Sequence, residues 1–310
     1  MRYQRLDLNL LTALRVLLTE QNVTRAAQVM HLTQPAMSGI LSRLREYFGD
    51  PLITPVGRKM ELTPLARSLA GPVSDLLVRI DATLGIKPEF DPATTRRRFS
   101  VVASDYVVNV LLGDVLKLVH RESPGMVIEL QQPATENAAH LEAGEIDLLV
   151  TPEGFASNNH SAVNLFEDGY CAVVDRDHPL VGDTIDLAQY AQLGHVAYEH
   201  LGKPFFESWF DRTYGELRQV RAITHTFGLL PQLVAGTELV ATMHARAATL
   251  LDPSLPLRRV RLDFSVPRLT EVLQWHEARN LDPGAQWLRE LIIARAAELP
   301  PLSSLTHLPV

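Results

Sequence analysis

The sequence predicts a chain in two parts. The first is an all-α N-terminal module with a small hairpin, continued by a long helix, and the second is a larger α/β body of two lobes. Three observations support this fold class. Apolar residues recur at helical spacing near the N-terminus, short β-branched runs alternate with helical segments after residue 97, and charge divides between the two parts. At 310 residues, the chain is long enough for two or three domains.

Charge is unevenly distributed along the chain. It carries 29 basic and 36 acidic side chains, a net charge of −7. Residues 1–67 hold nine basic and five acidic side chains, so this segment is +4 and the remainder is −11. A basic head on an acidic body indicates that the head alone meets a polyanion, although so small an excess is also compatible with chance clustering.

Composition and the N-terminus limit the class of protein. A single cysteine, Cys171, excludes an intramolecular disulfide. No apolar run approaches the roughly 20 residues needed to cross a bilayer. Asp7 and Asn9 interrupt the first apolar stretch, which is unlike a signal peptide. We therefore expect a soluble protein of a reducing cytoplasm with no membrane partner.

Three helices are expected in the first fifty residues. Asp7 can cap the first, whose leucines at positions 10, 14, 17 and 18 form one apolar stripe. Thr24 is expected to cap a short second helix, and Thr33 a third, with Pro35 in a first turn where the missing N–H costs nothing. His31 fits the intervening turn because histidine tolerates positive φ. The buried side of the third helix is expected to carry Ala36, Met37, Ile40, Leu41 and Leu44.

Two short helices joined by such a turn form a helix-turn-helix, whose second helix enters the major groove of DNA by its N-terminal end. There, Gln34 can make a bidentate contact to adenine, and Thr33 and Pro35 can touch a thymine methyl group. Arg43 and Arg45 lie further along the helix and suit phosphates. A three-helix bundle with no DNA role would show the same periodicity.

A hairpin and a long helix follow. Residues 51–55 and 59–62 flank Gly57, which supplies the turn, so they are expected to form a two-stranded wing; a solvated loop is the alternative. The side chains that we expect to contact DNA are Thr24, Thr33, Gln34, Pro35, Ser38 and Arg43, with Arg58 and Lys59 at the tip of the wing.

The long helix begins at Thr63-Pro64 by the cap-plus-proline rule, and Gly71-Pro72 should kink it. Its apolar positions keep mostly a spacing of three and four residues, as in the seam of a coiled coil. A helix packed on its own domain is the alternative, but a seam far from other core elements favours pairing with a second chain. The expected dimerisation residues are Leu69, Val73, Leu76 and Ile80.

The body alternates strands with helices, which predicts a mostly parallel sheet. The first lobe is expected to run strand, helix, strand, helix, strand at residues 99–103, 106–120, 126–131, 137–143 and 146–150. A second lobe takes strands at residues 166–174, 194–198, 220–223 and 239–243. A strand at residues 269–275 is expected to return to the first lobe, before a last helix at about 284–297.

Five N-terminal blocks carry a family resemblance: Leu6-Asp7-Leu8-Asn9-Leu10-Leu11, Thr24-Arg25-Ala26-Ala27, Leu32-Thr33-Gln34-Pro35-Ala36-Met37-Ser38, Leu44-Arg45 and Leu62-Thr63-Pro64. In order and spacing they resemble the DNA-binding domain of LysR-type transcriptional regulators. Further blocks extend the likeness over nearly the whole chain: Phe90-Asp91-Pro92, Arg97-Arg98-Phe99, Ser104-Asp105, Gly144-Glu145-Ile146-Asp147, Gly194-His195-Val196 and Leu273-Gln274-Trp275. These look most like the nodulation-protein-D branch, and relatives that sense salicylate-like and nitroaromatic acids share several of them.

The resemblance implies an N-terminal all-α winged helix-turn-helix with a long linker helix, and a C-terminal α/β effector domain of the two-lobed periplasmic-binding-protein type. The expected divisions are residues 1–63 for the DNA-binding domain, 64–85 for the linker helix, 86–96 for a hinge, 97–300 for the effector domain and 301–310 for a tail. Within the effector domain, lobe I is expected at about 97–163 and 268–300, and lobe II at about 164–267.

The same resemblance implies partners. It predicts a homodimer or homotetramer on double-stranded promoter DNA, at interrupted dyads of the T-N11-A type, and RNA polymerase as a further partner. It predicts an activator in the bacterial cytoplasm, associated with the nucleoid. No cofactor is implied beyond a small co-inducer, flavonoid-like or benzoate-like. His276 stands where relatives carry proline, so the effector preference of any one relative does not transfer safely.

Candidate pocket residues follow from a rule of open α/β sheets, in which ligands bind beyond the carboxyl ends of strands. Ser104 and Asp105 end the first strand, although both could simply cap a helix. Thr226-Phe227 opens a helix whose free N–H groups can hold an anion or a phenolic oxygen. His195 enters by likeness, against the alternative of a core histidine. The full set is Ser104, Asp105, Asn109, Glu153, His195, Thr226, Phe227 and Gln274, with Tyr198, His200, Lys203 and Phe205 on a loop over the cleft.

Catalytic motifs are absent from the sequence. There is no G-x-S-x-G elbow and no phosphate-binding loop. His276-Glu277 lacks the second histidine of a zinc protease, and His195 and His200 have no convincing metal-ligand spacing. We expect neither an enzyme nor a metal site. Two alternatives to an effector-controlled regulator remain: a solute-binding protein with a merely structural N-terminus, and a regulator with a vestigial pocket.

Overall fold

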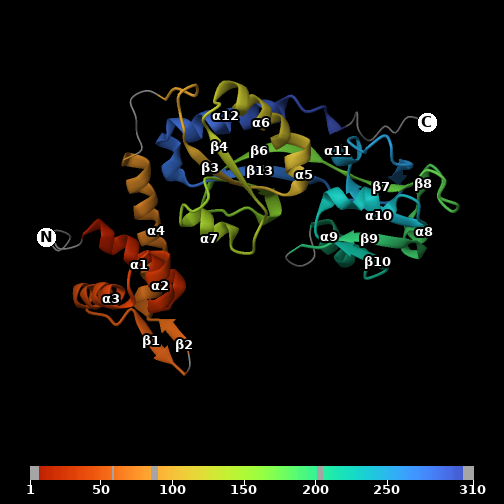
Figure 1. Cartoon of the computed structure of the whole chain (residues 1–310). Coiled ribbons are helices and arrows are strands. Elements are labelled where there is room, and N and C mark those ends of the chain that lie inside the picture. The colour runs from red at the N-terminus through yellow and green to blue at the C-terminus, as the bar shows by residue number, and fades with distance from the viewer. Residues whose placement is uncertain (1–6, 58, 85–89, 201–204, 303–310) are drawn as a thin grey trace. The chain divides into compact units, whose positions relative to one another are not determined.

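The computed structural model describes residues 7–57, 59–84, 90–200 and 205–302. The chain divides into two compact units, one built mainly from the N-terminal region and the other from the C-terminal body (Figure 1). Residues 86–89 of the expected hinge at 86–96, and residues 303–310 of the expected tail at 301–310, lie outside the described residues, whereas residues 90–96 are described and contain a turn at 92–94. No helix of the described segments has the length and apolar character needed to span a bilayer.

Three helices form the head, α1 (Leu8–Glu20), α2 (Val23–Val29) and α3 (Gln34–Phe48). Asp7 caps α1 as predicted, accepting a hydrogen bond from the backbone N–H of Asn9 at 2.7 Å. The prediction that Thr24 caps α2 is wrong. The helix begins two residues earlier, so the side chain of Asn22 is the cap and accepts from the backbone N–H groups of Thr24 and Arg25 at 2.9 and 3.0 Å.

The turn before α3 follows the prediction. His31 has a φ of 54°, in the left-handed region, and Thr33 caps α3 with Pro35 in its first turn. Met37, Leu41 and Leu44 are the buried residues of α3, and they join a core with the leucine stripe of α1. Ala36, expected on that buried side, is exposed because it lies on the outward face of the first turn.

The wing consists of β1 (Ile53–Val56) and β2 (Lys59–Leu62), an antiparallel pair with Val56 opposite Lys59. Gly57 turns the hairpin with a φ of 61°, which glycine adopts without strain. Arg45 does not serve as expected. Its Nε donates to the backbone oxygen of Pro51 at 2.8 Å and its Nη2 to that of Ile53 at 3.1 Å, so it fastens the wing to α3. Arg58 lies outside the described residues.

The long helix α4 (Pro64–Leu84) is continuous through Pro72. Its first half packs on α1, and Val73 and Leu77 are buried in the core of the head with Leu69 against them. The predicted seam is therefore corrected for Val73, which the head itself buries, whereas Leu69 is only partly buried. Leu76 is 44% exposed, and it faces away from that core.

Lobe I is a five-stranded sheet in the order β4-β3-β5-β13-β6 (Figure 1). Its strands are β3 (Arg98–Val102), β4 (Val127–Gln131), β5 (Leu148–Pro152), β6 (Ser161–Asp168) and β13 (Leu269–Trp275). β3 is parallel to β4 and β5, whereas the late strand β13 runs antiparallel to β5 and β6. The return of β13 to this lobe was predicted; the sheet is mixed because β6 and β13 connect to lobe II.

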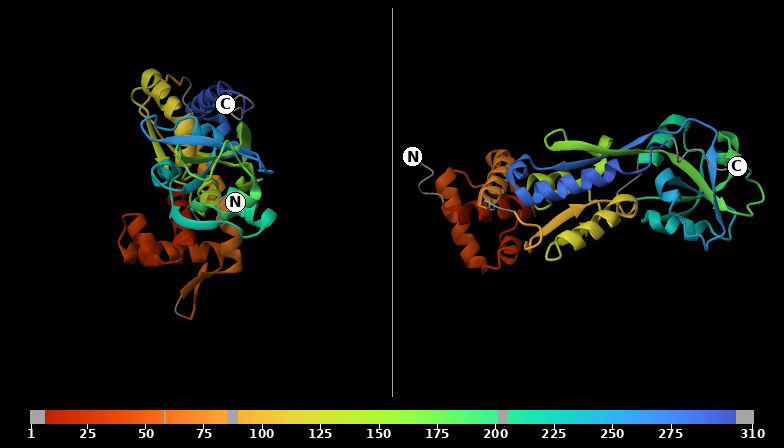
Figure 2. Two further views of the ribbon diagram at one scale, coloured as in Figure 1. Left: turned by 90° about the vertical axis from the view of Figure 1, so that its right-hand side faces the viewer. Right: turned by 90° about the horizontal axis from the view of Figure 1, so that it is seen from above.

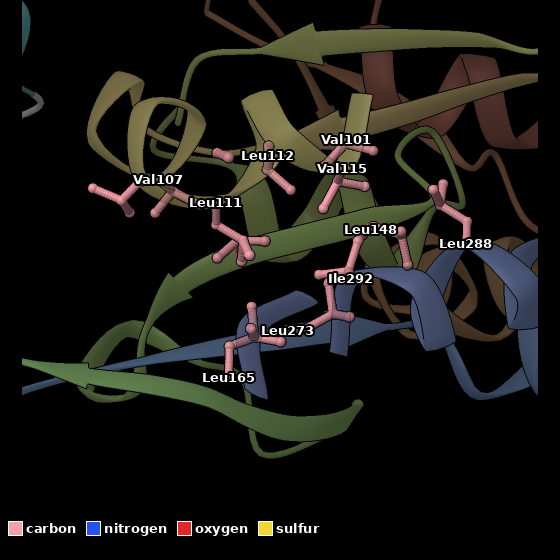
Figure 3. Close-up of a cluster of buried hydrophobic side chains, with 14 of the residues drawn as sticks. Val101, Val107, Leu111, Leu112, Val115, Leu148, Leu165, Leu273, Leu288 and Ile292 are labelled. Carbon is pink, nitrogen blue, oxygen red and sulfur yellow. The ribbon is translucent and has the colours of Figure 1, made fainter. Parts of the chain in front are cut away.

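One helical layer covers this sheet. It contains α5 (Asp105–Val107), the π-helical turn η2 (Val108–Leu112), α6 (Gly113–Glu122) and α12 (Pro283–Ala297). Figure 3 shows Leu111 and Leu112 from η2 and Ile292 from α12 among the strand residues Leu148 and Leu273, all within one buried cluster. The short helix η3 (Glu153–Phe155) also belongs to this lobe, whereas most of α7 (Asn137–Glu142) and of η5 (Glu277–Leu281) groups with the N-terminal unit.

Lobe II is a six-stranded sheet in the order β10-β9-β11-β7-β12-β8, and it adjoins lobe I in the view from above in Figure 2. Its strands are β7 (Tyr170–Asp175), β8 (Thr184–Ile185), β9 (Gly194–Tyr198), β10 (Gln219–Thr224), β11 (Leu239–His244) and β12 (Leu257–Leu262). Its helices are α8 (Leu187–Gln192), α9 (Phe205–Tyr214), η4 (Phe227–Leu229), α10 (Leu230–Val234) and α11 (Ala245–Ala248).

The chain crosses between the lobes twice. The single strand predicted at 166–174 is two strands, because β6 ends in the sheet of lobe I at Asp168 and β7 begins in that of lobe II at Tyr170. The sequence does not indicate this change of sheet, because both strands are apolar and each is buried in its own lobe. The second crossing joins β12 to β13.

The junction between wing and α4 yields a stability prediction. The buried Thr63 accepts from the backbone N–H of Ala66 at 3.1 Å and donates to the Asp50 carboxylate at 2.6 Å. Thr63→Ala removes the cap and leaves Asp50 short of a donor, so we expect the head to lose about 1–2 kcal/mol. Hydrogen exchange should quicken in the first turn of α4. Thr19→Ala on exposed helix surface is the control, and equal exchange in both variants would contradict the prediction.

Candidate functional site

The outer face of the helix-turn-helix is the first candidate site. Because Met37, Leu41 and Leu44 turn toward the core, the opposite side of α3 is left in solvent. The predicted DNA-contacting residues that the structure describes are all exposed: Thr24, Thr33, Gln34, Pro35, Ser38, Arg43 and Lys59. This face offers an amide at the start of a helix and cations further along it and on the wing.

The second candidate site is a cavity of about 380 Å³ in the C-terminal body. It lies where the two lobes meet, and it is lined by residues from both sheets. Seven aromatic rings line it: Tyr106, Phe155, Tyr170, Tyr198, Phe205, Phe206 and Phe227. Pockets of about 300–1,000 Å³ with apolar walls and a few placed polar groups are typical of small-molecule sites.

Three of the predicted pocket residues line the cavity: Ser104, Phe227 and Gln274. Ser104 also caps α5, accepting from the backbone N–H of Val107 at 3.3 Å. Gln274 binds the backbone of Ser157, donating to its oxygen at 2.7 Å and accepting from its N–H at 2.9 Å. Gln274 therefore fixes a wall of the cavity, because both ends of its amide are already occupied.

Asp105 connects the lobes beside the cavity. Its Oδ2, at the start of α5 in lobe I, accepts from the backbone N–H of Gly228 in lobe II at 2.8 Å. Phe227, next to Gly228, stacks on Tyr198 with ring centroids 3.6 Å apart. Thr226 is the cap of η4 and is not among the lining residues. Asp105 and Thr226 thus hold elements that form the wall of the cavity, without lining it themselves.

Three predictions fail for the cavity. His195 is 1% exposed, and its Nε2 lies 2.7 Å from the backbone oxygen of Tyr190. It sits near the beginning of β9, whereas the cavity is at the carboxyl end, where Tyr198 lines it. Burial lowers the pKa of His195 to about 4, as for a core histidine. Asn109 and Glu153 are exposed, and neither lines the cavity.

The lining contains buried polar residues that sequence reasoning missed. Glu207 on α9, His244 at the end of β11 and Glu271 on β13 are all less than 10% exposed. Polar residues inside otherwise apolar strands were the available signal for His244 and Glu271. From the expected loop, Tyr198, His200 and Phe205 line the cavity, and Lys203 lies outside the described residues.

Burial sets the charge of these groups. Desolvation, reinforced by Asp168, raises the pKa of Glu271 to about 8. Desolvation raises the pKa of Glu207 to about 7, although Arg218 lies 3.5 Å from its carboxylate. Desolvation lowers the pKa of His244 to about 3. At neutral pH, Glu271 is therefore a protonated acid and His244 a neutral imidazole.

Family models match both candidate sites. Residues 8–67 match the model described as a bacterial regulatory helix-turn-helix protein of the lysR family, and residues 92–297 match the LysR substrate binding domain. Nodulation protein D 1 of a Bradyrhizobium species is 37% identical over 301 residues, which cover 96% of each chain. Nodulation protein D 2 of Rhizobium leguminosarum bv. phaseoli is 35% identical and covers 96% of this chain and 95% of its own.

Solved structures share the fold. A probable transcriptional regulator from Pseudomonas aeruginosa superposes with a TM-score of 0.63 at 25% identity, covering 95% of this chain and 98% of its own. A full-length OxyR variant from Pseudomonas aeruginosa superposes with a TM-score of 0.70 at 18% identity, covering 93% and 94%.

The charge state of Glu271 has a testable consequence for stability. A carboxyl whose pKa is higher in the folded than in the unfolded chain stabilises the folded state fully at pH values below the unfolded pKa. This contribution to stability is lost as the pH rises toward the folded pKa. From pH 5 to 8 the native chain should therefore lose up to about 1.4 kcal/mol per pH unit through Glu271. Glu271→Gln abolishes this loss, so its stability relative to the native chain should rise with pH.

Urea denaturation at several pH values measures this difference. Thr270→Val, the neighbouring change on β13, removes no ionisable group and should shift stability equally at every pH. A Glu271→Gln difference that is flat from pH 5 to 8 would show that this carboxyl is ionised in the native chain.

Proposed function

Because the chain belongs to the LysR family of transcriptional regulators, we propose that it binds promoter DNA through α3 and the wing while a small aromatic molecule in the lobe cavity controls transcription. The observation that carries this proposal is an aromatic-lined cavity between two lobes, in a chain whose helix-turn-helix keeps its recognition face exposed. It is a regulator, and we propose no enzymatic role for it.

The DNA contacts divide by chemistry. Gln34, at the exposed start of α3, reads an adenine edge in the major groove, with Thr33, Pro35 and Ser38 beside it. Arg43 and Lys59 neutralise phosphates and fix the position of the head without reading sequence. Lys59 stands on the wing that Arg45 fastens to α3, so the two contact regions keep a constant spacing.

The assembly we propose is a homodimer, or a pair of dimers, joined through α4. The exposed leucines Leu65 and Leu76 on α4 offer apolar surface that the head does not cover, and Ile80, one turn after Leu76, is half-buried. Two heads would then address half-sites about one helical turn or a multiple apart. Contact with RNA polymerase, activation as the usual outcome and a place on the cytoplasmic nucleoid complete this proposal.

The effector enters the cavity and alters the closure of the lobes. A ligand shifts two states only by its difference in affinity for them, so it must contact both lobes. The cavity meets this requirement because its lining comes from both sheets, and the Asp105–Gly228 hydrogen bond stands beside it. Flavonoid-like and benzoate-like molecules are the candidate classes, since the nodulation protein D relatives share the fold and over a third of the residues.

Competing functions separate by two measurements. A solute-binding protein would bind ligand without salt-sensitive affinity for DNA, and a regulator with a vestigial pocket would bind DNA without any response to aromatic molecules. Thermal-shift screening against an aromatic library tests the pocket, because a true ligand raises the melting temperature with concentration.

DNA binding gives a residue-level prediction. Gln34→Ala should relax base preference at one position at a cost of about 1–3 kcal/mol, because it removes a bidentate base contact. Arg43→Ala should instead weaken binding to all sequences alike. Native affinity should fall roughly tenfold or more between low and physiological salt, as phosphate contacts release counterions.

Gel-shift titrations on the intergenic DNA beside the gene and on single-base variants measure these effects. Gln286→Ala makes the same chemical change on exposed α12 surface and should leave binding unchanged. If Gln34→Ala keeps the native order of preference among the variants, the base-reading role of Gln34 is wrong.

A further inference from the structure

Three residues of the cavity wall carry buried polar atoms without a partner among the described residues. These atoms are the Tyr170 hydroxyl, Nδ1 of His244 and Oε2 of Glu271. Burial of such an atom is unfavourable unless a water or a ligand satisfies it. Outside the cavity, unpartnered atoms are scattered over both lobes, whereas these three meet at the crossing of the chain. Their common position points to a shared occupant.

The topology brings the three residues together. Tyr170 begins β7 immediately after the first crossing, and His244 ends β11 directly opposite it in the antiparallel pairing, with ring centroids 4.9 Å apart. Glu271 is the third residue of β13, which follows the second crossing, and it lies close enough for its ionised form to raise the pKa of Tyr170. We call these three residues the polar recess of the cavity.

The recess is uncharged but offers both kinds of hydrogen-bonding group. A protonated Glu271 donates one hydrogen bond and accepts others, neutral His244 has one donor and one acceptor nitrogen, and the Tyr170 hydroxyl can do either. A ligand hydroxyl, itself both donor and acceptor, is the group that complements them. An ether or an apolar substituent would leave a buried atom unsatisfied.

An anion is disfavoured at the same place. Among the described lining residues there is no lysine or arginine. On lobe II, Arg218 is already paired with Glu207 and with Asp211 at 3.5 and 3.9 Å. The guanidinium of Arg246 donates to the backbone oxygens of Glu167 and Pro300, so it is occupied as well. Behind the recess, the Asp168 carboxylate accepts from the Tyr106 hydroxyl at 2.6 Å and adds negative potential. A ligand carboxylate would be desolvated without a counter-ion.

We propose that Glu271, together with Tyr170 and His244, determines effector specificity: the recess binds a hydroxyl of an uncharged aromatic molecule and excludes aromatic carboxylates. This inference rests on the proposed effector function of the cavity and chooses between its two candidate classes. The aromatic walls, including the stacked Phe227 and Tyr198, hold the flat remainder of such a ligand.

Calorimetric titration of the full chain with four probes tests the proposal, at about pH 6.5 so that phenolic hydroxyls stay protonated. Apigenin and unsubstituted flavone differ in their hydroxyls, and methyl 4-hydroxybenzoate and 4-hydroxybenzoate differ in charge. We expect apigenin to bind at least about tenfold more tightly than flavone, and the ester at least about tenfold more tightly than the carboxylate.

Variants assign the effect to the recess. Glu271→Leu should reduce apigenin affinity about tenfold, toward that of flavone, whereas Glu271→Gln keeps a neutral donor and acceptor and should stay within about threefold of the native chain. Tyr170→Phe removes one orphaned hydroxyl, so it should weaken apigenin binding while leaving the unliganded chain as stable or more so. Glu153→Gln, an exposed glutamate outside the lining, is the control and should change neither.

The outcomes separate this inference from the function on which it rests. Equal binding of the ester and the carboxylate, or a hydroxyl preference that survives Glu271→Leu and Tyr170→Phe, overturns the role of the recess and leaves an aromatic effector site standing. Failure of all four probes to bind overturns the aromatic effector together with the recess.

Discussion

The buried carboxylate of Asp168 is the interaction on which the C-terminal body depends. It stands at the last position of β6, where the chain leaves lobe I, and is fully buried. It accepts from the Tyr106 hydroxyl of α5 at 2.6 Å, from the backbone N–H of Gly169 at 2.7 Å, and from that of Arg246 on α11 at 3.2 Å. One acid therefore ties both lobes to the crossing. Removing its donors would leave a buried charge unpaired, which is among the most costly defects in a protein interior.

This constraint also gives the cavity its character. Because Asp168 holds Tyr106 in place, the ring of Tyr106 can stack on His244 with centroids 3.9 Å apart and form part of the wall. Its negative potential favours the protonated form of Glu271 nearby. Asp168 therefore both anchors the fold and sets the polarity of the ligand site. A substitution of Asp168 would alter both.

In the head, internal hydrogen bonds hold the wing against α3, and the outer surface of α3 stays exposed to solvent. Arg45 donates to two backbone oxygens of the wing, and Thr63 donates to Asp50. Their bonds keep the wing and α3 in register. Gln34, Arg43 and Lys59 are left exposed, and each can be assigned a role by its position on this rigid frame.

The sequence alone determined the local structure of this protein. Local features depend on only a few neighbouring residues, so they can be predicted from the sequence. They include the helical and strand periods, the caps Asp7 and Thr33, the positive φ of His31 and the family blocks. Tertiary structure decided what depends on distant partners. Asn22 rather than Thr24 caps α2, and Arg45 hydrogen-bonds the wing. The strand predicted at 166–174 is divided between two sheets, and His195 is buried in a core. The rule of strand ends predicted three of the lining residues, Ser104, Phe227 and Gln274. Tyr170, His244 and Glu271 also line the cavity, because the two crossings of the chain, about 100 residues apart in sequence, lie together there. Their burial and protonation are properties of that meeting, which no local pattern contains.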